Sequence, residues 1–525
     1  MEESSLNQNQ TSEVLHSSKK RLVKMVLGFF VIMIFAGVLF FLRAPLTSIF
    51  AGVDDGDKGQ ELVIAYAESF TTLSPLNYEV RNRNYLGNFY EGLTRFDKNL
   101  AIEPALAVSW GQIDDETWEF SLRSDVYFHD GSLLDSGDVV SSIEKAMQDE
   151  NSQLKSLLSS VQSVSAVDDK TVTIVTNGVD PILPNRLVHV YIYSSEVTDF
   201  ENVVIGTGPY YVASSETFNE GMISQELSLK AFPYYWGLKP VYSDVKLVAI
   251  PNSSDREEAI SSGSVSVLVN VPIDSVSSLE EVGIKIQTQP NLDVNFLLFN
   301  TLDGNVFNNI ALREAFFMAL NRDELVSTLS GYANLTDQFI GQGVNGYDST
   351  ISALSYNSDQ AKNIFEEYGI EELSVYMVSD MTALGDFIKD QFAAIGIDAE
   401  IVYSDLQTFQ QGILDNEYDV YFMGWKCDLG DASDLYETVF HSKTDLYGAY
   451  NGGYSNSEVD SLIEDASIEE DAMNRLSILK EIAHILVEDD VAGVPMFESE
   501  VIYGFKDGVS WSPRVDGYLW ASDVR

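Results

Sequence analysis

The sequence predicts an α/β protein preceded by one membrane-spanning helix, and three observations support this prediction. Residues 25–42 form an uncharged apolar run, and strand-like and helix-like apolar spacings are mixed without a fixed repeat over the rest of the chain. A length of 525 residues corresponds to about three lobes at roughly 100–200 residues each. Apolar residues make up 45% of the chain, which supplies packed cores and excludes an intrinsically disordered protein.

The apolar run 25–42 is the predicted membrane anchor. Its 18 residues approach the length of a bilayer span and exceed the usual hydrophobic region of a secretory signal. Four basic residues lie within 19–24 and only Arg43 follows directly, so the positive-inside rule places residues 1–24 in the cytoplasm and the later residues outside the cell. A cleaved signal peptide is the alternative, because residues 36–38 (AGV) are small.

Residues 43–59 are predicted to be a linker, because they become rich in Gly and Asp toward their end. Asp54, Asp55 and Asp57 lack the glutamate that closes a calcium-binding loop, so we expect no bound metal. The single cysteine, Cys427, lies far from the N-terminus. It therefore forms no intrachain disulfide and offers no N-terminal site for lipid attachment.

The charge of the chain excludes nucleic acid as a partner. Asp and Glu number 81 against 31 Lys and Arg, which gives a formal net charge of −50. Affinity for nucleic acid depends on basic side chains that neutralise phosphates. The acidic surface is weak evidence for cationic ligands, because the screening length at physiological salt is only about 8 Å.

Apolar spacing predicts the individual elements of the fold. Continuous or alternating apolar runs predict strands at 62–66, 171–176 and 246–250. Apolar residues three and four apart predict helices at about 139–147, 312–320, 384–395 and 473–487. A mixture of strands and helices of these lengths is typical of the α/β class.

The sequence offers little from which to build an enzyme. It contains no G-x-S-x-G, no G-x-x-x-x-G-K-[ST] and no H-E-x-x-H, and its five histidines lack metal-ligand spacing. Residues 341–346 (GQGVNG) match G-x-G-x-x-G, but a loop follows where a dinucleotide site needs a helix N-terminus. We therefore expect no catalytic residues and no cofactor.

A series of segments after the linker resembles one protein family. The segments follow the order and approximate spacing of that family, and they are YEGLTRF (90–96), IEPALAVSW (102–110), FSLRSDVYFHDG (120–131), DVV (138–140), GTGPY (206–210), YYWG (234–237), LREAF with ALNRDEL (312–325) and VPM (494–496). Through them the chain resembles the bacterial extracellular solute-binding proteins of the peptide/nickel/opine type, which serve ABC importers.

This resemblance implies a periplasmic-binding-protein-like fold of type II, similar to the large cluster C, in which two lobes close on a ligand beside an extra third domain. Transferred to this sequence, the first lobe comprises 60–82, 205–289 and 491–525, the extra domain 83–204, and the second lobe 290–490. A ligand that contacts both lobes only in the closed state supplies the free energy of closure.

The resemblance also implies a ligand site in the segment 424–431 (GWKCDLGD). Peptide-binding relatives use an aspartate here to hold the α-ammonium group of the ligand, and the register assigns this role to Asp431, with Asp428 as second choice. Trp425 would add an apolar wall or a cation–π face. The expected ligand-binding residues of this segment are Gly424, Trp425, Cys427, Asp428 and Asp431. The alternative is an acidic surface loop beside a core tryptophan.

A second expected site is the loop that contains Glu68, Ser69, Phe70 and Thr71, whose backbone would bond an extended peptide. Dipeptide-selective relatives fix the ligand carboxylate with an arginine, whereas residues 378–385 of this chain contain no basic residue. We therefore do not expect strict selectivity for dipeptides.

From this resemblance we predict a monomeric, membrane-anchored substrate-binding component of an ABC importer, which captures peptides outside the cell and delivers them to a permease. The alternatives are a different cargo, such as a nickel chelate, an opine or a sugar, and a surface sensor or adhesin without transport. An enzyme that reuses the architecture is disfavoured, because no nucleophile and base can be paired.

Overall fold

The computed structural model of the chain describes residues 61–200, 203–213, 225–329, 332–379, 381–443 and 451–525. The predicted cytoplasmic tail, membrane anchor and linker, at 1–24, 25–42 and 43–59, lie outside these described residues. Among the helices that the structure describes, none is both long and apolar enough to span a bilayer.

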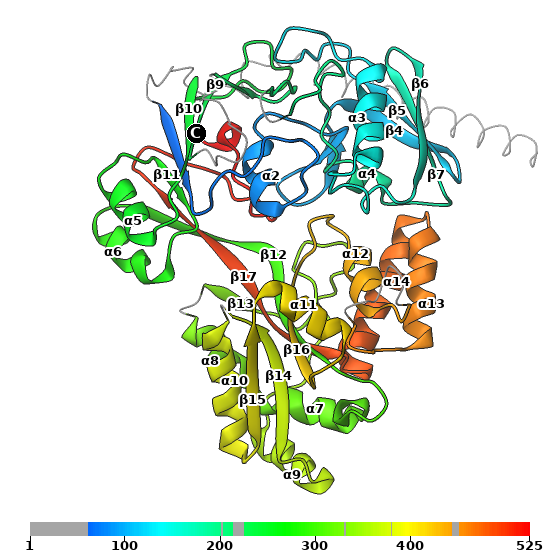
Figure 1. Ribbon diagram of the computed structural model, residues 1–525, viewed down its shortest axis with the longest axis vertical. Coiled ribbons are helices and arrows are strands. Elements are labelled where there is room, and N and C mark those ends of the chain that lie inside the picture. Colours follow the sequence, from blue (N-terminus) through cyan, green and yellow to red (C-terminus); the bar gives the residue numbers. More distant parts are fainter. Residues whose placement is uncertain (1–60, 201–202, 214–224, 330–331, 380, 444–450) are drawn as a thin grey trace, which may run out of the picture. The chain divides into compact units, whose positions relative to one another are not determined.

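A sheet of 11 strands organises the described chain (Figure 1). In spatial order its strands are β15 (Asp398–Ser404), β14 (Glu372–Val378), β16 (Val420–Lys426), β12 (Lys285–Phe299), β17 (Gly493–Phe505), β11 (Val267–Val269), β1 (Leu62–Tyr66), β10 (Asp244–Ala249), β9 (Glu226–Ala231) and β8 (Tyr210–Val212), with β13 (Ala333–Leu335) paired to β17 beside this path. Strand β1 pairs in parallel with β10 and β11. A strand buried between parallel neighbours is apolar throughout, as β1 is.

Most of the described helices begin after an Asn or Asp that caps the first turn. The side chains of Asn252, Asn309 and Asp471, for example, accept hydrogen bonds from first-turn N–H groups of their helices. The helices of the described part are α2 (Val80–Leu86), α3 (Ser136–Gln148), α4 (Leu183–Arg186), α5 (Ser253–Ser261), α6 (Val276–Glu281), α7 (Ile310–Ala319), α8 (Arg322–Thr328), α9 (Ser358–Tyr368), α10 (Thr382–Ile395), α11 (Leu406–Leu414), α12 (Ser433–Leu435), α13 (Ser457–Ile468) and α14 (Ala472–His484). The four predicted helices correspond to α3, α7, α10 and α14, and the three predicted strands to β1, β7 (Thr171–Thr176) and β10.

Two antiparallel strands, β12 and β17, connect the two ends of the large sheet (Figure 1). We call the end with β1, β8–β11, α5 and α6 lobe I, and the end with β13–β16 and α7–α14 lobe II. In Figure 1, lobe I lies above lobe II. Both connecting strands are long, with 15 residues in β12 and 13 in β17, because each belongs to both lobes.

Side chains alternate along β12, so that lobe II has a hydrophobic core on each face of its sheet. Val294, Phe296 and Leu298 pack with α13 and α14 on one face. Leu297 and Phe299 pack with α7, α9 and α10 on the other face. This period of two is the pattern of a strand buried on both sides.

A separate antiparallel sheet follows α2 in the chain, and we call it and its helices the extra domain. Its order is β4 (Ala107–Asp114), β5 (Thr117–Leu122), β7 (Thr171–Thr176) and β6 (Val161–Asp168). Alternate residues of β7 are buried under α3, as the period of its sequence predicts. Helix α3 begins with a capping box between Asp135 and Asp138.

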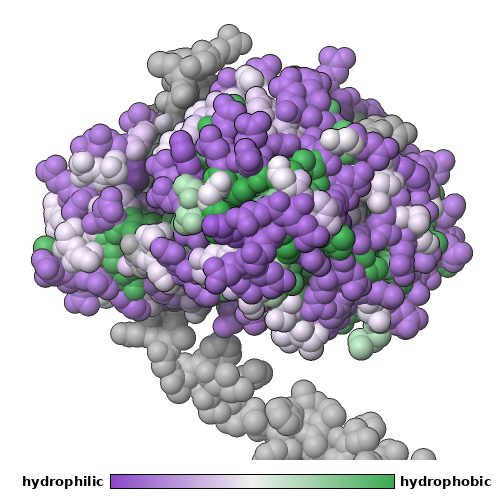
Figure 2. Space-filling view, turned by 90° about the horizontal axis from the view of Figure 1, so that it is seen from below, coloured by the Kyte–Doolittle hydropathy of each residue, from purple (hydrophilic) through white to green (hydrophobic). Residues whose placement is uncertain are grey.

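The face of the molecule in Figure 2 is mostly hydrophilic. Hydrophilic residues cover most of this face, and hydrophobic residues form small patches between them. Small apolar patches are normal on the surface of a soluble domain, so they do not by themselves indicate a docking surface.

The connection between the lobes contains a bulge. The pair Pro290–Glu500 is followed by the pair Val294–Glu498, so the register advances by four residues along β12 but by only two along β17. Leu292 within the bulge has a φ of 67°, a left-handed conformation that costs a leucine about 1–2 kcal/mol. Its N–H donates to Oε1 of Glu498 at 3.2 Å. The bulge is therefore the point where the crossing strands are least regular.

Glu498 makes the stability of this connection depend on pH. Burial raises its pKa to about 7, and the negative charges of Glu500 and Asp293 act in the same direction. The folded state therefore binds a proton more tightly than the unfolded state, and stability falls as the pH rises from about 5 through 7.

We expect Glu498→Gln to raise the free energy of unfolding at pH 8 by up to about 3 kcal/mol and to have little effect at pH 5, because the amide keeps the Oε1 acceptor without the charge. Urea unfolding of the wild type and the variant at both pH values measures the difference. The exposed Glu400 provides a control as Glu400→Gln. Equal or lower stability of Glu498→Gln at pH 8 would contradict the prediction.

Candidate functional site

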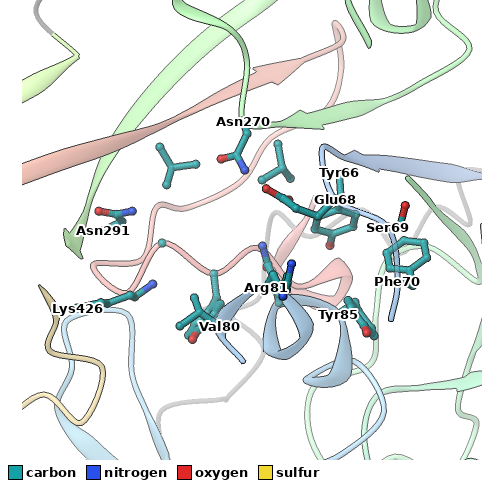
Figure 3. A pocket seen from close by; sticks show the side chains of 15 residues that line it. Tyr66, Glu68, Ser69, Phe70, Val80, Arg81, Tyr85, Asn270, Asn291 and Lys426 are labelled. Atoms are coloured by element: carbon teal, nitrogen blue, oxygen red, sulfur yellow. The ribbon is translucent and has the colours of Figure 1, made fainter. Parts of the chain in front are cut away.

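A cavity of about 300 Å³ lies beside the bulge, and we call it the hinge cavity. It is lined by Glu68, Ser69 and Phe70 from the loop after β1, by Asn291 of the bulge, and by Lys426 at the end of β16. Figure 3 shows that these side chains come from both lobes, with α2 on one side of the cavity. The hinge cavity therefore lies where lobe I meets lobe II.

A second cavity, of about 650 Å³, contains Asp428 in its wall, and we call it the Asp428 cavity. Arg83, His189 and Tyr191 also line it, and Tyr518 lines both cavities. Its volume is in the range of about 300–1,000 Å³ that small-molecule sites usually have.

Two stacked rings with a cation at each end line the two cavities. The Lys426 Nζ is 4.6 Å from the Tyr518 ring centroid, and the Tyr518 and Trp520 rings are parallel to within 8°. The Arg514 guanidinium then lies 4.4 Å from the Trp520 ring. Lys426 also donates to the carbonyl oxygen of Asp516 at 2.8 Å. The stack fixes the end of β16 against the C-terminal segment of lobe I.

Asp428 follows β16 in a loop that is held on the extra domain. Its carbonyl oxygen lies 2.9 Å from Nε2 of His189, and Asn185 donates to the next carbonyl oxygen, that of Leu429. The Tyr78 hydroxyl lies 3.4 Å from Oδ1 of Asp428. Asp428 is buried, and among the described residues it forms no ion pair. Lys426 and Arg83 attract this carboxylate electrostatically without bonding it, so it can still accept a charge-assisted bond from a ligand.

Asp431, the first-choice ligand aspartate of the sequence prediction, lies outside both cavities. Arg475 on α14 binds it with two bonds, of 2.6 and 2.8 Å, and Asn345 and Ser433 donate to the same carboxylate. Burial raises the pKa of Asp431, but these donors outweigh burial, so its pKa lies below the ordinary value. Protein groups thus fully occupy this carboxylate.

The glycine motif at 341–346 supports the same loop. The N–H of Asn345 donates to Gly430, and the N–H of Ala432 donates to Asn345, each at 2.9 Å. Gly346 has a φ of 109°, and a Cβ there would lie 2.8 Å from the Cβ of Ala432. The glycine is thus explained by close packing of two loops.

The other predicted residues of the segment 424–431 belong to the sheet and the core. Cys427 is fully buried, and burial raises the pKa of its thiol well above the ordinary value. Trp425 packs against the core that α13 and α14 form in lobe II. Gly424 is exposed and pairs with Asn295 of β12. None of these three residues lines either cavity.

Only some of the predicted ligand-binding residues in the loop after β1 line a cavity. Glu68, Ser69 and Phe70 line the hinge cavity, whereas Thr71 does not. The Thr71 hydroxyl instead donates to Oδ1 of Asn82 at 2.9 Å. The structure thus brings three residues of this loop into one cavity and places Asp428 in the adjacent one.

Several titratable groups in the region of Asp428 have pKa values that are shifted from their ordinary values. Burial, with Asp428 nearby, raises the pKa of Asp434 to about 7. Burial also raises the pKa of Glu437 to about 7, although Arg186 opposes the shift. Burial lowers the pKa of Lys426, against the attraction of Asp428 and other acids. Within the described chain, no group of three or more His, Cys, Asp or Glu side chains is arranged to hold a metal ion.

Comparison with known proteins assigns the chain to a family. The model for bacterial extracellular solute-binding proteins, family 5 Middle, matches residues 101–446, which is more than half of the sequence. The chain belongs to this family.

Individual relatives are distant in sequence but similar in structure. The dipeptide-binding protein of Escherichia coli (strain K12) is 23% identical over 441 residues, which are 76% of this chain and 81% of that protein. The structure of HbpA2 from Haemophilus parasuis has a TM-score of 0.78 at 21% identity and covers 89% of this chain and 99% of its own. The structure of the periplasmic binding protein DppA from Helicobacter pylori, in complex with the peptide STSA, has a TM-score of 0.71 at 22% identity. It covers 88% of this chain and 98% of its own. These likenesses confirm the predicted α/β periplasmic-binding-protein fold of type II.

The two aspartates should respond differently to the same substitution. Asp431→Asn leaves Arg475 buried without its counter-charge, so we expect a loss of about 3–5 kcal/mol in the free energy of unfolding. Asp428→Asn removes a charge that has no ion-pair partner, so we expect a change of less than about 1 kcal/mol. Urea unfolding of the ligand-free proteins measures both. A loss at Asp428 as large as that at Asp431 would contradict this assignment.

Proposed function

We propose that this chain is the substrate-binding component of an ABC importer that captures peptides between its lobes and delivers them to a membrane permease. Family membership supports the solute-binding role. Peptides are proposed because a relative is named a dipeptide-binding protein and a structural neighbour holds a peptide. The observation that carries the proposal is Asp428, a buried carboxylate in the wall of a 650 Å³ cavity without an ion-pair partner among the described residues.

Asp428 is the proposed anchor for the α-ammonium group of the peptide. An ammonium group would give the carboxylate its missing counter-charge, and bonds between charged groups are roughly twice as strong as neutral ones. The Tyr78 hydroxyl and the backbone contact with His189 hold Asp428 in place. Asp431 is not proposed for this role, because Arg475 already neutralises it.

The hinge cavity is the proposed place for further contacts with the ligand. Glu68, Ser69 and Phe70 reach it from lobe I and Lys426 from lobe II, so a ligand there contacts both lobes. Closure then follows from the tighter binding of the closed state. The proposed units for this motion are 60–82, 205–289 and 491–525 as the first lobe, with 290–490 as the second.

The proposal is tested by the binding of a mixed tripeptide pool with free termini, measured by thermal shift and calorimetry after refolding has removed any co-purified ligand. We expect the wild type to bind and Asp428→Asn to bind roughly 10- to 100-fold more weakly, because a charge-assisted bond is lost. N-acetylation of the pool should weaken binding to the wild type by a similar factor.

The exposed Asp398 on β15 provides a matched control, and Asp398→Asn should bind as the wild type does. Absence of binding by the wild type would exclude peptide capture. Unchanged binding by Asp428→Asn would exclude Asp428 as the anchor.

We also propose that the apolar run 25–42 tethers the extracellular domain to the membrane. The support is its length without charge and the excess of basic residues before it. The full chain, expressed in bacteria, should sediment with membranes and resist a high-salt wash. Ile34→Arg with Phe35→Arg should release it to the soluble fraction, whereas Ser4→Arg with Ser5→Arg should not. A wild-type chain found only in the soluble fraction would contradict the tether.

A further inference from the structure

Arg83 is a buried cation whose nitrogens are only partly bonded. It lies on α2 and has 4% of its surface exposed. Its Nε and Nη1 have no hydrogen-bond partner within the described chain, although the side chain bonds Tyr191. An arginine stays protonated in proteins, so these donors require an acceptor from outside the protein.

The surroundings of Arg83 position it without neutralising it. The rings of Tyr78 and Tyr191 lie 5.0 and 5.7 Å from its guanidinium carbon and hold it by cation–π contact. Arg83 and Asp428 line the same cavity, but among the described residues neither has an ion-pair partner. The two opposite charges attract each other electrostatically but are not joined by an ion pair, so each can still bond a ligand.

Four other polar atoms of residues in this wall also lack a partner in the described chain. They are the hydroxyl of Tyr518, Nδ1 of His189, Nε1 of Trp520 and Oδ2 of Asp523, and of these residues Tyr518 and His189 are nearly fully buried. Buried polar groups are almost always bonded in native structures, and unbonded ones in a cavity indicate where a polar ligand binds. Together with Arg83, these atoms place polar groups without hydrogen-bond partners along the wall of the cavity.

We infer that Arg83 binds the carboxylate of the ligand while Asp428 holds its ammonium group, so that the cavity selects short peptides with two free termini. This inference rests on the proposed function and adds an anionic subsite to it. The unbonded Nη1 of Arg83 can donate a charge-assisted hydrogen bond to one carboxylate oxygen, and Nε can donate another along its own edge of the guanidinium. The Tyr518 hydroxyl can donate to the same anion. The subsite belongs to α2, outside the segment 378–385 that lacks a basic residue.

The test compares two tripeptide pools of identical composition, one with free C-termini and one with C-terminal amides. We expect the wild type to prefer the free acids by roughly 10- to 100-fold. Arg83→Met should lose this preference by weakening only the binding of the acids, while it still discriminates against N-acetylated peptides. Asp428→Asn should show the reverse pattern.

Arg83→Lys and Lys362→Met serve as controls. Arg83→Lys keeps the charge without the planar fork and should retain part of the preference. Lys362→Met removes an exposed positive charge on α9 and should bind as the wild type does. Binding of the amide pool by Arg83→Met shows that the variant is folded. If that variant does not fold, the same comparison is made with Arg83→Lys, whose unchanged preference would overturn the inference.

The outcomes separate this inference from the proposed function. If no pool binds to the wild type, the proposed function fails and the inference fails with it. If acids and amides bind the wild type equally, peptide capture stands and the anionic subsite is excluded. A preference that persists in Arg83→Met also excludes Arg83 as the carboxylate partner.

Discussion

The buried ion pair between Asp431 and Arg475 fixes the loop on which the proposed site depends. It joins the loop after β16 to helix α14 through two short bonds, with Asn345 and Ser433 as further donors. Such a pair adds little net stability over an apolar contact, but loss of either partner is costly. The main effect of the ion pair here is to fix the position of the loop after β16. Asp431 is held in the core of lobe II, and the preceding residues lie against the extra domain, where Asp428 lines the cavity.

Charged groups in this region therefore have two distinct roles. Asp431 with Arg475, and Asp516 with Arg514, are buried pairs that hold loops together. Asp428 and Arg83 are also buried, yet they have no ion-pair partner in the described chain. Unpaired buried charges are unfavourable in the free protein, and a fold retains them where a ligand supplies the counter-charge. The distinction between paired and unpaired charge thus separates structural residues from candidate binding residues.

The sequence allowed the fold to be predicted much better than the site. Apolar residues alternate along β7 because one face of that strand is buried, and they are continuous along β1 because both of its faces are buried. Local spacing in the sequence therefore predicts both strands. The role of Asp431 depends on Arg475, which lies 44 positions away on another helix, and no local pattern connects the two. Asp428 and Asp431 lie three positions apart in the same segment and offer the same carboxylate chemistry, so the sequence alone could not decide between them.

Other features lay beyond the sequence for the same reason. Arg83 belongs to a short helix without a distinctive pattern, and its significance depends on a cavity that distant segments enclose. The glycines at 341–346 signalled a close approach of backbone, but only the packed loop shows that the approaching group is the protein itself. Spacing predicts which residues are buried, whereas pairing of charges appears only in three dimensions.

The same unpaired charges bear on how the lobes close. The loop at 428–430 contacts the extra domain through backbone bonds from His189 and Asn185, so opening the cleft breaks these contacts. Closing it without a ligand, however, buries Asp428 and Arg83 as charges that attract each other but form no direct ion pair, which opposes closure. A peptide with free termini removes both penalties at once, while one with a blocked terminus removes only one. Because a ligand shifts a conformational equilibrium by its difference in affinity for the two states, a zwitterionic peptide drives closure more strongly than either blocked form.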